Sequence, residues 1–141
     1  MLDTIYSQIA GAIVLLVSGF AFWKGDMPEK RGAGVIAIAF LASIIIQDQS
    51  DYDSIAIMGV DVVVLCALGL LAWNSDRNWP IWAAACQSIV VASHFAYLLD
   101  FQISVRAYLN AQALAAYAVV FCLAAGTFIA WREREALKGM T

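Results

Sequence analysis

The sequence contains little charge for its length. Only 13% of its 141 residues are charged, whereas 63% are hydrophobic. A water-soluble domain of this size carries about twice that share of charge, and a disordered chain needs low hydrophobicity, so both classes are excluded. The composition instead predicts an all-α protein embedded in a membrane, with the lipid bilayer as its first partner.

Basic residues and paired cysteines are also scarce. Eight Lys and Arg stand against eleven Asp and Glu, a net charge of −3, which leaves no basic surface for nucleic acid. The three cysteines, Cys66, Cys86 and Cys122, lie inside apolar runs and form no Cys-x-x-Cys motif. We therefore expect neither nucleic-acid binding nor a metal site or redox pair.

Catalytic signatures are missing as well. The chain has no His-Glu-x-x-His, no Gly-x-Ser-x-Gly and no glycine-rich phosphate loop, and it offers no second intramembrane aspartate for an aspartyl pair. On this basis we expect that the protein is not an enzyme.

Five apolar runs, each about 20 residues long, are separated by polar breaks. A helix of that length crosses ~30 Å of hydrocarbon at about 1.5 Å per residue. The runs predict a single bundle of five transmembrane helices with short loops, over residues 4–23, 28–47, 55–73, 80–99 and 106–131. The second run reaches membrane length only if Pro28 begins the helix, which Asp26 and Glu29 favour because they have capping-box spacing.

The charges are distributed unevenly over the breaks between these runs. With the N-terminus outside, seven of the eight Lys and Arg lie inside and only Arg106 lies outside, as the positive-inside rule demands. The first charge is Asp3, which favours an uncleaved anchor over an export signal. We therefore predict a protein of the cell inner membrane with its N-terminus outside and its C-terminus inside. All five tryptophans are then expected at the inner interface: Trp23, Trp73, Trp79, Trp82 and Trp131.

Small residues at four-residue spacing predict where helices pack, because they let two backbones approach closely. The fourth run carries such a stripe at Ala84, Ser88, Ala92 and Ala96. The fifth run carries another at Ala111 and Ala115. The two stripes predict a close antiparallel pair of the fourth and fifth helices.

Ionisable side chains within a span cost ~2.5–3.5 kcal/mol at a helix centre, so they are candidates for function. Asp61 and His94 are such residues, and the helical rise places both roughly 8–9 Å below the outer boundary. Each helix contributes a polar side chain to this depth, which predicts a cluster of Asp61, His94, Gln112, Gln8, Ser43 and Ser93. Such a cluster either holds the bundle together or carries a proton or a polar group.

Two functions are consistent with these features. We favour a small accessory or structural subunit of a larger inner-membrane complex of the energy-transducing kind, because the loops are short and catalytic residues are missing. The alternative is a small oligomeric proton-coupled transporter or channel that uses Asp61 and His94. A minor alternative is a pigment or haem held by His94, the single histidine. The expected partner is accordingly a larger membrane complex or further copies of the chain, and the sequence identifies no cofactor.

Overall fold

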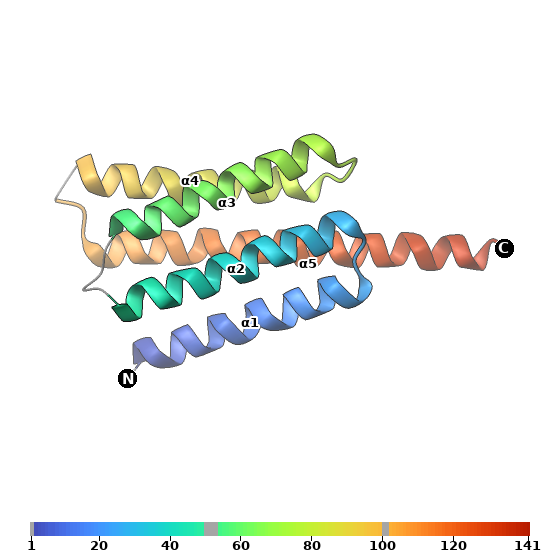
Figure 1. Ribbon diagram of the computed structural model, residues 1–141, viewed down its shortest axis with the longest axis horizontal. Helices are drawn as coiled ribbons and strands as arrows, with labels where there is room; N and C mark the ends of the chain where they lie inside the picture. Colours follow the sequence, from blue (N-terminus) through green and yellow to red (C-terminus); the bar gives the residue numbers. More distant parts are fainter. Residues whose placement is uncertain (1, 50–53, 100–101) are drawn as a thin grey trace.

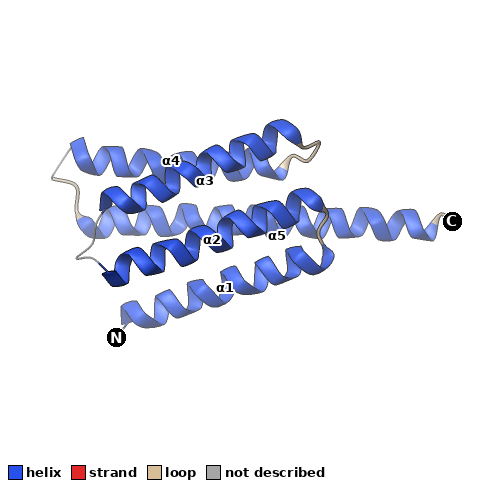
Figure 2. Cartoon of the chain, viewed as in Figure 1, coloured by secondary structure: helices blue, strands red, loops and turns tan. Residues whose placement is uncertain are grey.

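The computed structural model describes residues 2–49, 54–99 and 102–141, which contain helices and connecting turns but no strand (Figure 2). The helices are α1 (Leu2–Lys24), α2 (Met27–Gln49), α3 (Ser54–Asn74), α4 (Trp79–Leu99) and α5 (Val105–Gly139). The predicted all-α fold is confirmed, and each helix contains one of the five predicted runs. The fifth helix extends well beyond its run, to Gly139.

Successive helices run antiparallel, and the last one returns to the first (Figure 1). Each helix contacts the next one along the chain, and α5 also contacts α1 and α2, so the five helices close a ring. The α1–α2 turn, the α3–α4 loop and the projecting end of α5 lie at one end of the bundle, opposite the N-terminus. We call this the inner end, after its predicted side, and the opposite end the outer end.

Within the residues that the structure describes, three helices are long and apolar enough to cross a membrane. They are Ile55–Asn74 within α3, Trp79–Leu99 and Val105–Gly139, whereas Gln8–Lys24 of α1 is a shorter apolar helix. The start of α2 carries Glu29, Lys30 and Arg31, which shortens its apolar stretch. The structure thus supports membrane association, while five spans and their orientation remain predictions.

The Glu29 half of the predicted capping box at the start of α2 is confirmed, while the Asp26 carboxylate pairs with Arg77 and Arg134. The Asp26 backbone N–H donates a hydrogen bond to Glu29 Oε2 at 3.0 Å, and the Lys30 N–H donates to the Asp26 carbonyl oxygen at 3.0 Å. Pro28 lies within the first turn, where its missing N–H leaves no intrahelical bond unmade. These contacts explain why α2 begins before its apolar stretch does.

Glycines at the inner end make room for one large side chain. Trp79, at the start of α4, is only 6% exposed, and its indole lies between Gly32 of α2 and Gly126 of α5. A Cβ at either glycine would overlap the indole ring. Trp79 therefore lies at the inner end, as predicted for its depth, but packs in the core and not on the bundle surface. Trp23, Trp73 and Trp82, in contrast, are exposed on the bundle surface.

The predicted pairing of α4 with α5 is confirmed, because these two helices form the most extensive contact in the bundle. The predicted contact stripe on α4 is wrong: Ser88, Ala92 and Ala96 are exposed, and Ala84 is half-buried. On α5, Ala115 is buried but Ala111 is exposed. The buried face of α4 is offset by about one residue, and it contains Trp79, Pro80, Ala83, Gln87, Val90, Val91 and His94. This face turns inward because it carries the polar Gln87 and His94, which lipid cannot satisfy.

Candidate functional site

The outer half of the bundle contains a network of polar side chains centred on His94. His94 lies five residues before the end of α4 and is 2% exposed. Its neighbours come from both flanking helices, with Asp61 on α3 and Tyr108 and Gln112 on α5. Gln87, two turns earlier on α4, completes the set. We call these five residues the outer polar network.

The network is joined by short hydrogen bonds. His94 Nε2 lies 2.8 Å from Asp61 Oδ2, and His94 Nδ1 lies 2.6 Å from the Tyr108 hydroxyl. Gln87 Nε2 donates to Asp61 Oδ1 at 3.1 Å and to the Asp61 carbonyl oxygen at 3.3 Å. Gln112 Nε2 donates to the Tyr108 hydroxyl at 3.0 Å and lies 2.7 Å from His94 Nε2. The network therefore links α3, α4 and α5.

The positions of the protons are restricted by these contacts. Each ring nitrogen of a histidine has one in-plane position, which either carries a proton or accepts one. A neutral His94 that donates from Nε2 to an ionised Asp61 would point its N–H at the N–H of Gln112. That arrangement contains one repulsive contact between two donors.

One additional proton on the pair removes the conflict. If Asp61 Oδ2 is protonated, it donates to the lone pair of Nε2, Nδ1–H donates to Tyr108, and Gln112 donates to the Tyr108 hydroxyl. If His94 is instead an imidazolium and Gln112 turns its amide oxygen to the ring, both ring N–H groups meet acceptors. Both arrangements have no net charge, which a low-dielectric interior favours over an uncompensated carboxylate. The geometry thus fits a site that holds a proton.

The structure brings together three of the predicted cluster residues, Asp61, His94 and Gln112. Gln8 is exposed in a groove between α1 and α2, and the Ser93 hydroxyl donates to the Val90 carbonyl oxygen at 2.7 Å. Neither Gln8 nor Ser93 belongs to the network. Ser43 lies on the wall of a cavity that Asp61 also lines.

Sequence reasoning missed Gln87 and Tyr108. Gln87 precedes His94 by seven residues, two helical turns, and Tyr108 precedes Gln112 by four, so each shares a helix face with a predicted member. This spacing is the feature of the sequence that predicts both residues as members of the network. Tyr108 also stacks on Tyr97, with ring centroids 4.6 Å apart, which fixes the tyrosine beside His94.

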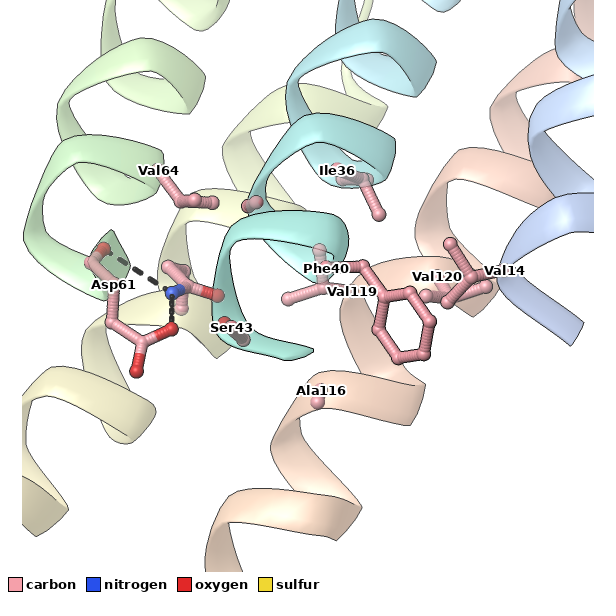
Figure 3. A pocket seen from close by; sticks show the side chains of 11 residues that line it. Val14, Ile36, Phe40, Ser43, Asp61, Val64, Ala116, Val119 and Val120 are labelled. Atoms are coloured by element: carbon pink, nitrogen blue, oxygen red, sulfur yellow. Dashed lines mark hydrogen bonds between the residues drawn. The ribbon is translucent and has the colours of Figure 1, made fainter. Parts of the chain in front are cut away.

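A cavity of about 150 Å³ lies between the five helices and adjoins Asp61 (Figure 3). Figure 3 shows Asp61 at one side of the cavity and the apolar residues Phe40, Val119 and Val120 at the other. Ser43 and Gln87 also line it. The carboxylate therefore lies between the buried histidine and this cavity.

Metal ligation receives no support from this arrangement. Within residues 2–49, 54–99 and 102–141, no group of three or more His, Cys, Asp or Glu side chains is placed to hold a metal ion. Both ring nitrogens of His94 are engaged in hydrogen bonds inside the protein. The geometry therefore favours hydrogen bonding by His94 over axial ligation of a haem or pigment.

A second network closes the inner end. Arg77, in the α3–α4 loop, pairs with Asp26 at 3.0 Å, lies 4.0 Å from Glu29 and hydrogen-bonds Glu133. Glu29 is fully buried, and its Oε1 accepts a hydrogen bond from Trp79 Nε1 at 2.9 Å. Arg134 pairs with Asp26 at 3.3 Å. We call these six residues the inner ionic network.

The inner ionic network carries permanent charge. The hydrogen bond to Glu133, aided by the negative charges of Glu29 and Asp26, raises the pKa of Arg77 against a smaller opposing effect of burial. A guanidinium does not deprotonate in proteins. This network can therefore tie the α3–α4 loop to α2 and α5, but Arg77 cannot exchange a proton.

In comparisons with known proteins, no family model, no curated protein and no solved structure matches this chain. Function is therefore inferred from the geometry of the two networks and the cavity.

Proposed function

We propose that this is an integral membrane protein of the inner membrane whose Asp61–His94 pair takes up and releases a proton. In this proposal the five helices are five spans with the N-terminus outside, and the pair is the coupling site of a small transporter or channel. The observation that carries it is a histidine only 2% exposed, bonded at both ring nitrogens, whose carboxylate partner lines a cavity.

Proton exchange is supported by the chemistry of the outer polar network. Histidine is the side chain whose ordinary charge change falls nearest to neutral pH. Tyr108 and Gln112 can reverse the direction of their hydrogen bonds by turning a hydroxyl or an amide. A proton can thus reach His94 from the Tyr108 side and leave through Asp61 toward the cavity.

Nitrogen NMR of protein labelled with [15N]histidine tests proton uptake. Because the chain has a single histidine, both ring signals belong to His94. In lipid nanodiscs at about pH 5 to 9, we expect the signals to move between two protonation states. In Asp61→Asn, which keeps the size of the side chain but removes its charge, the pH dependence of the ring signals should differ from that of the wild-type protein.

Ser93→Ala is the matched control, because Ser93 adjoins His94 but bonds the Val90 carbonyl oxygen outside the network. This variant should leave the pH dependence unchanged. Ring signals that stay constant over the whole pH range in the folded protein would contradict the proposal.

Proteoliposomes test the coupling role. Vesicles that contain a pH-sensitive dye should lose an imposed pH difference faster with the wild-type protein than with His94→Gln. For a channel, we expect this difference in rate without any added solute. For a transporter, we expect it when the transported solute is present. Equal rates for the two proteins under both conditions would leave His94 with a structural role only.

A second candidate function is that of an accessory subunit. The observation that favours it is the end of α5, which projects beyond the bundle at the inner end (Figure 1) and exposes Arg132, Glu135, Leu137 and Lys138. Such a projecting helix is suited to docking on a larger partner. Purification in mild detergent should then recover a stoichiometric membrane partner, and deletion of residues 136–141 should release it.

A further inference from the structure

The cavity beside Asp61 has two chemically different walls. Its polar wall consists of the Asp61 carboxylate, the Gln87 amide and the Ser43 hydroxyl. Its apolar wall consists of Val14, Ile36, Phe40, Val64, Val119 and Val120, with Ala39 and Ala116 between them. A cavity with such walls fits a molecule that has a polar head and a short apolar body.

The polar wall has unused capacity to accept hydrogen bonds. An ionised carboxylate has about four lone-pair positions, and Asp61 uses one for Gln87 and one for His94. The Ser43 hydroxyl adds another oxygen to this wall. The Asp61 side chain is also 21% exposed, so it is accessible from the cavity side. Because the polar wall offers hydrogen-bond acceptors and the negative charge of Asp61, it favours a ligand that has N–H donors and a positive charge.

The size of the cavity limits the ligand. A cavity of about 150 Å³ accommodates a molecule of about six non-hydrogen atoms, as benzene binding to an engineered apolar cavity of that volume illustrates. The grooves between α1 and α2 and between α2 and α3 are lined without any carboxylate. A pocket at the inner end contains Asp76 and Glu133 but also the positive charge of Arg77, which disfavours a cation. Among these described spaces, the cavity beside Asp61 is therefore the one that suits a small cation.

We propose that this cavity binds a small monovalent organic ammonium ion, whose charge replaces the extra proton of the Asp61–His94 pair. The inference rests on the proposed proton exchange and names the substrate class of the same site. When the ammonium group reaches Asp61, its N–H groups donate to the carboxylate, and His94 gives up one proton and becomes neutral. That proton is released to the medium, and the Tyr108 hydroxyl at His94 Nδ1 is the neighbouring group that can accept it and pass it on.

The exchange conserves the charge of the site. An imidazolium and a carboxylate sum to zero, and so do an alkylammonium ion and the same carboxylate beside a neutral imidazole. A single carboxylate in a low-dielectric interior compensates one positive charge, so the proton and the organic cation exclude each other. The Phe40 ring, on the side of the cavity opposite Asp61, lies where it can pack against the alkyl chain of the ligand.

The binding test uses butylammonium chloride with the full chain in nanodiscs, in weakly buffered medium containing a pH dye. We expect one proton to be released for each butylammonium ion bound, and the His94 ring signals to move to the neutral state. n-Butanol, which has the same alkyl chain but no charge, should release no proton. Proton release by n-butanol, or butylammonium binding without proton release, would overturn the inference.

Two variants on α2 separate the cavity from the membrane-facing surface. Ser43→Leu fills the cavity and should weaken butylammonium binding by about tenfold or more. Ala42→Leu, at the neighbouring position, fills the α2–α3 groove instead and should leave binding unchanged. Equal affinities in the two variants would place the ligand elsewhere and overturn the inference.

The outcomes also distinguish this inference from the proposed function. If the His94 signals respond to pH but not to butylammonium, the ammonium site is wrong and proton exchange stands. If they respond to neither, both proposals are wrong.

Discussion

The two polar networks occupy opposite ends of the same bundle and have opposite chemistry. The outer polar network contains one carboxylate and one imidazole among neutral donors and acceptors, so a single proton can change its charge. The inner ionic network contains two guanidinium groups among three carboxylates, and the guanidinium groups keep their charge.

This difference shows how a small bundle can combine a fixed frame with a changeable site. The α3–α4 hairpin carries Asp61 and His94 toward the outer end and Arg77 and Trp79 at the inner end. The inner contacts hold the hairpin to α2 and α5. Protons and amide groups can therefore rearrange at the outer end without the helices moving apart.

The largest effect is expected at the inner end, from Glu29→Ala. This change leaves the Trp79 indole N–H and the Asp26 backbone N–H without their acceptor and removes a buried negative charge beside Arg77. Loss of one member of a buried pair costs about 3–5 kcal/mol. Reversible unfolding in mixed micelles should show a loss of this size in the free energy of unfolding.

Glu133→Ala provides the matched comparison, because Glu133 bonds the same guanidinium but is mostly exposed. Its cost should be much smaller than that of Glu29→Ala. Similar costs for the two variants would show that burial of Glu29 contributes little to holding the inner end.

A smaller effect is expected where α4 packs against its neighbours. Ala83 is fully buried in the core, so Ala83→Leu should cost about 1–3 kcal/mol through overpacking. Ala92, on the exposed face of the same helix, should accept leucine with almost no change in the free energy of unfolding. A larger cost at Ala92 than at Ala83 would restore the stripe that small-residue spacing predicted.

Much of the fold is predictable from sequence because lipid demands long apolar helices and polar turns. The five runs therefore gave the five helices, and the capping box located the start of α2. The extension of α5 was missed because the charges after Trp131 indicate the end of a span, not the end of a helix. The helix continues with charged residues, and Lys138 pairs with Glu135 at 3.1 Å.

The site is only partly predictable, because depth along a helix does not determine direction around it. Asp61, His94 and Gln112 lie at the same depth and on helix faces that point toward one another. Their side chains therefore come within hydrogen-bond distance. Gln8 and Ser93 share only the depth. Glu29 was recognised as a cap, but its bond to Trp79 depends on how α2 and α4 cross, which no local pattern encodes.

Coupling between Asp61 and His94 should be next in size. A double-mutant cycle with Asp61→Asn and His94→Gln should give non-additivity of about 1 kcal/mol in the free energy of unfolding, since a bond between two helices is lost in either variant. The same cycle with Ser93→Ala in place of His94→Gln should be additive. Additive costs for Asp61 and His94 would mean that the pair contributes no joint stability.

The smallest expected effect is a difference in salt dependence between the two ends. Arg77 and Glu133 are partly exposed, so ions can reach their pair, which is worth about 0.2–1 kcal/mol. Raising the salt concentration from about 0.05 M to about 1 M shortens the screening length to about 3 Å and should remove most of the cost of Glu133→Ala. The Asp61–His94 coupling should keep its value over the same range, because His94 is enclosed by the protein. If salt weakened both equally, ions would reach the Asp61–His94 pair as readily as the Arg77–Glu133 pair, and the contrast between the two ends would fail.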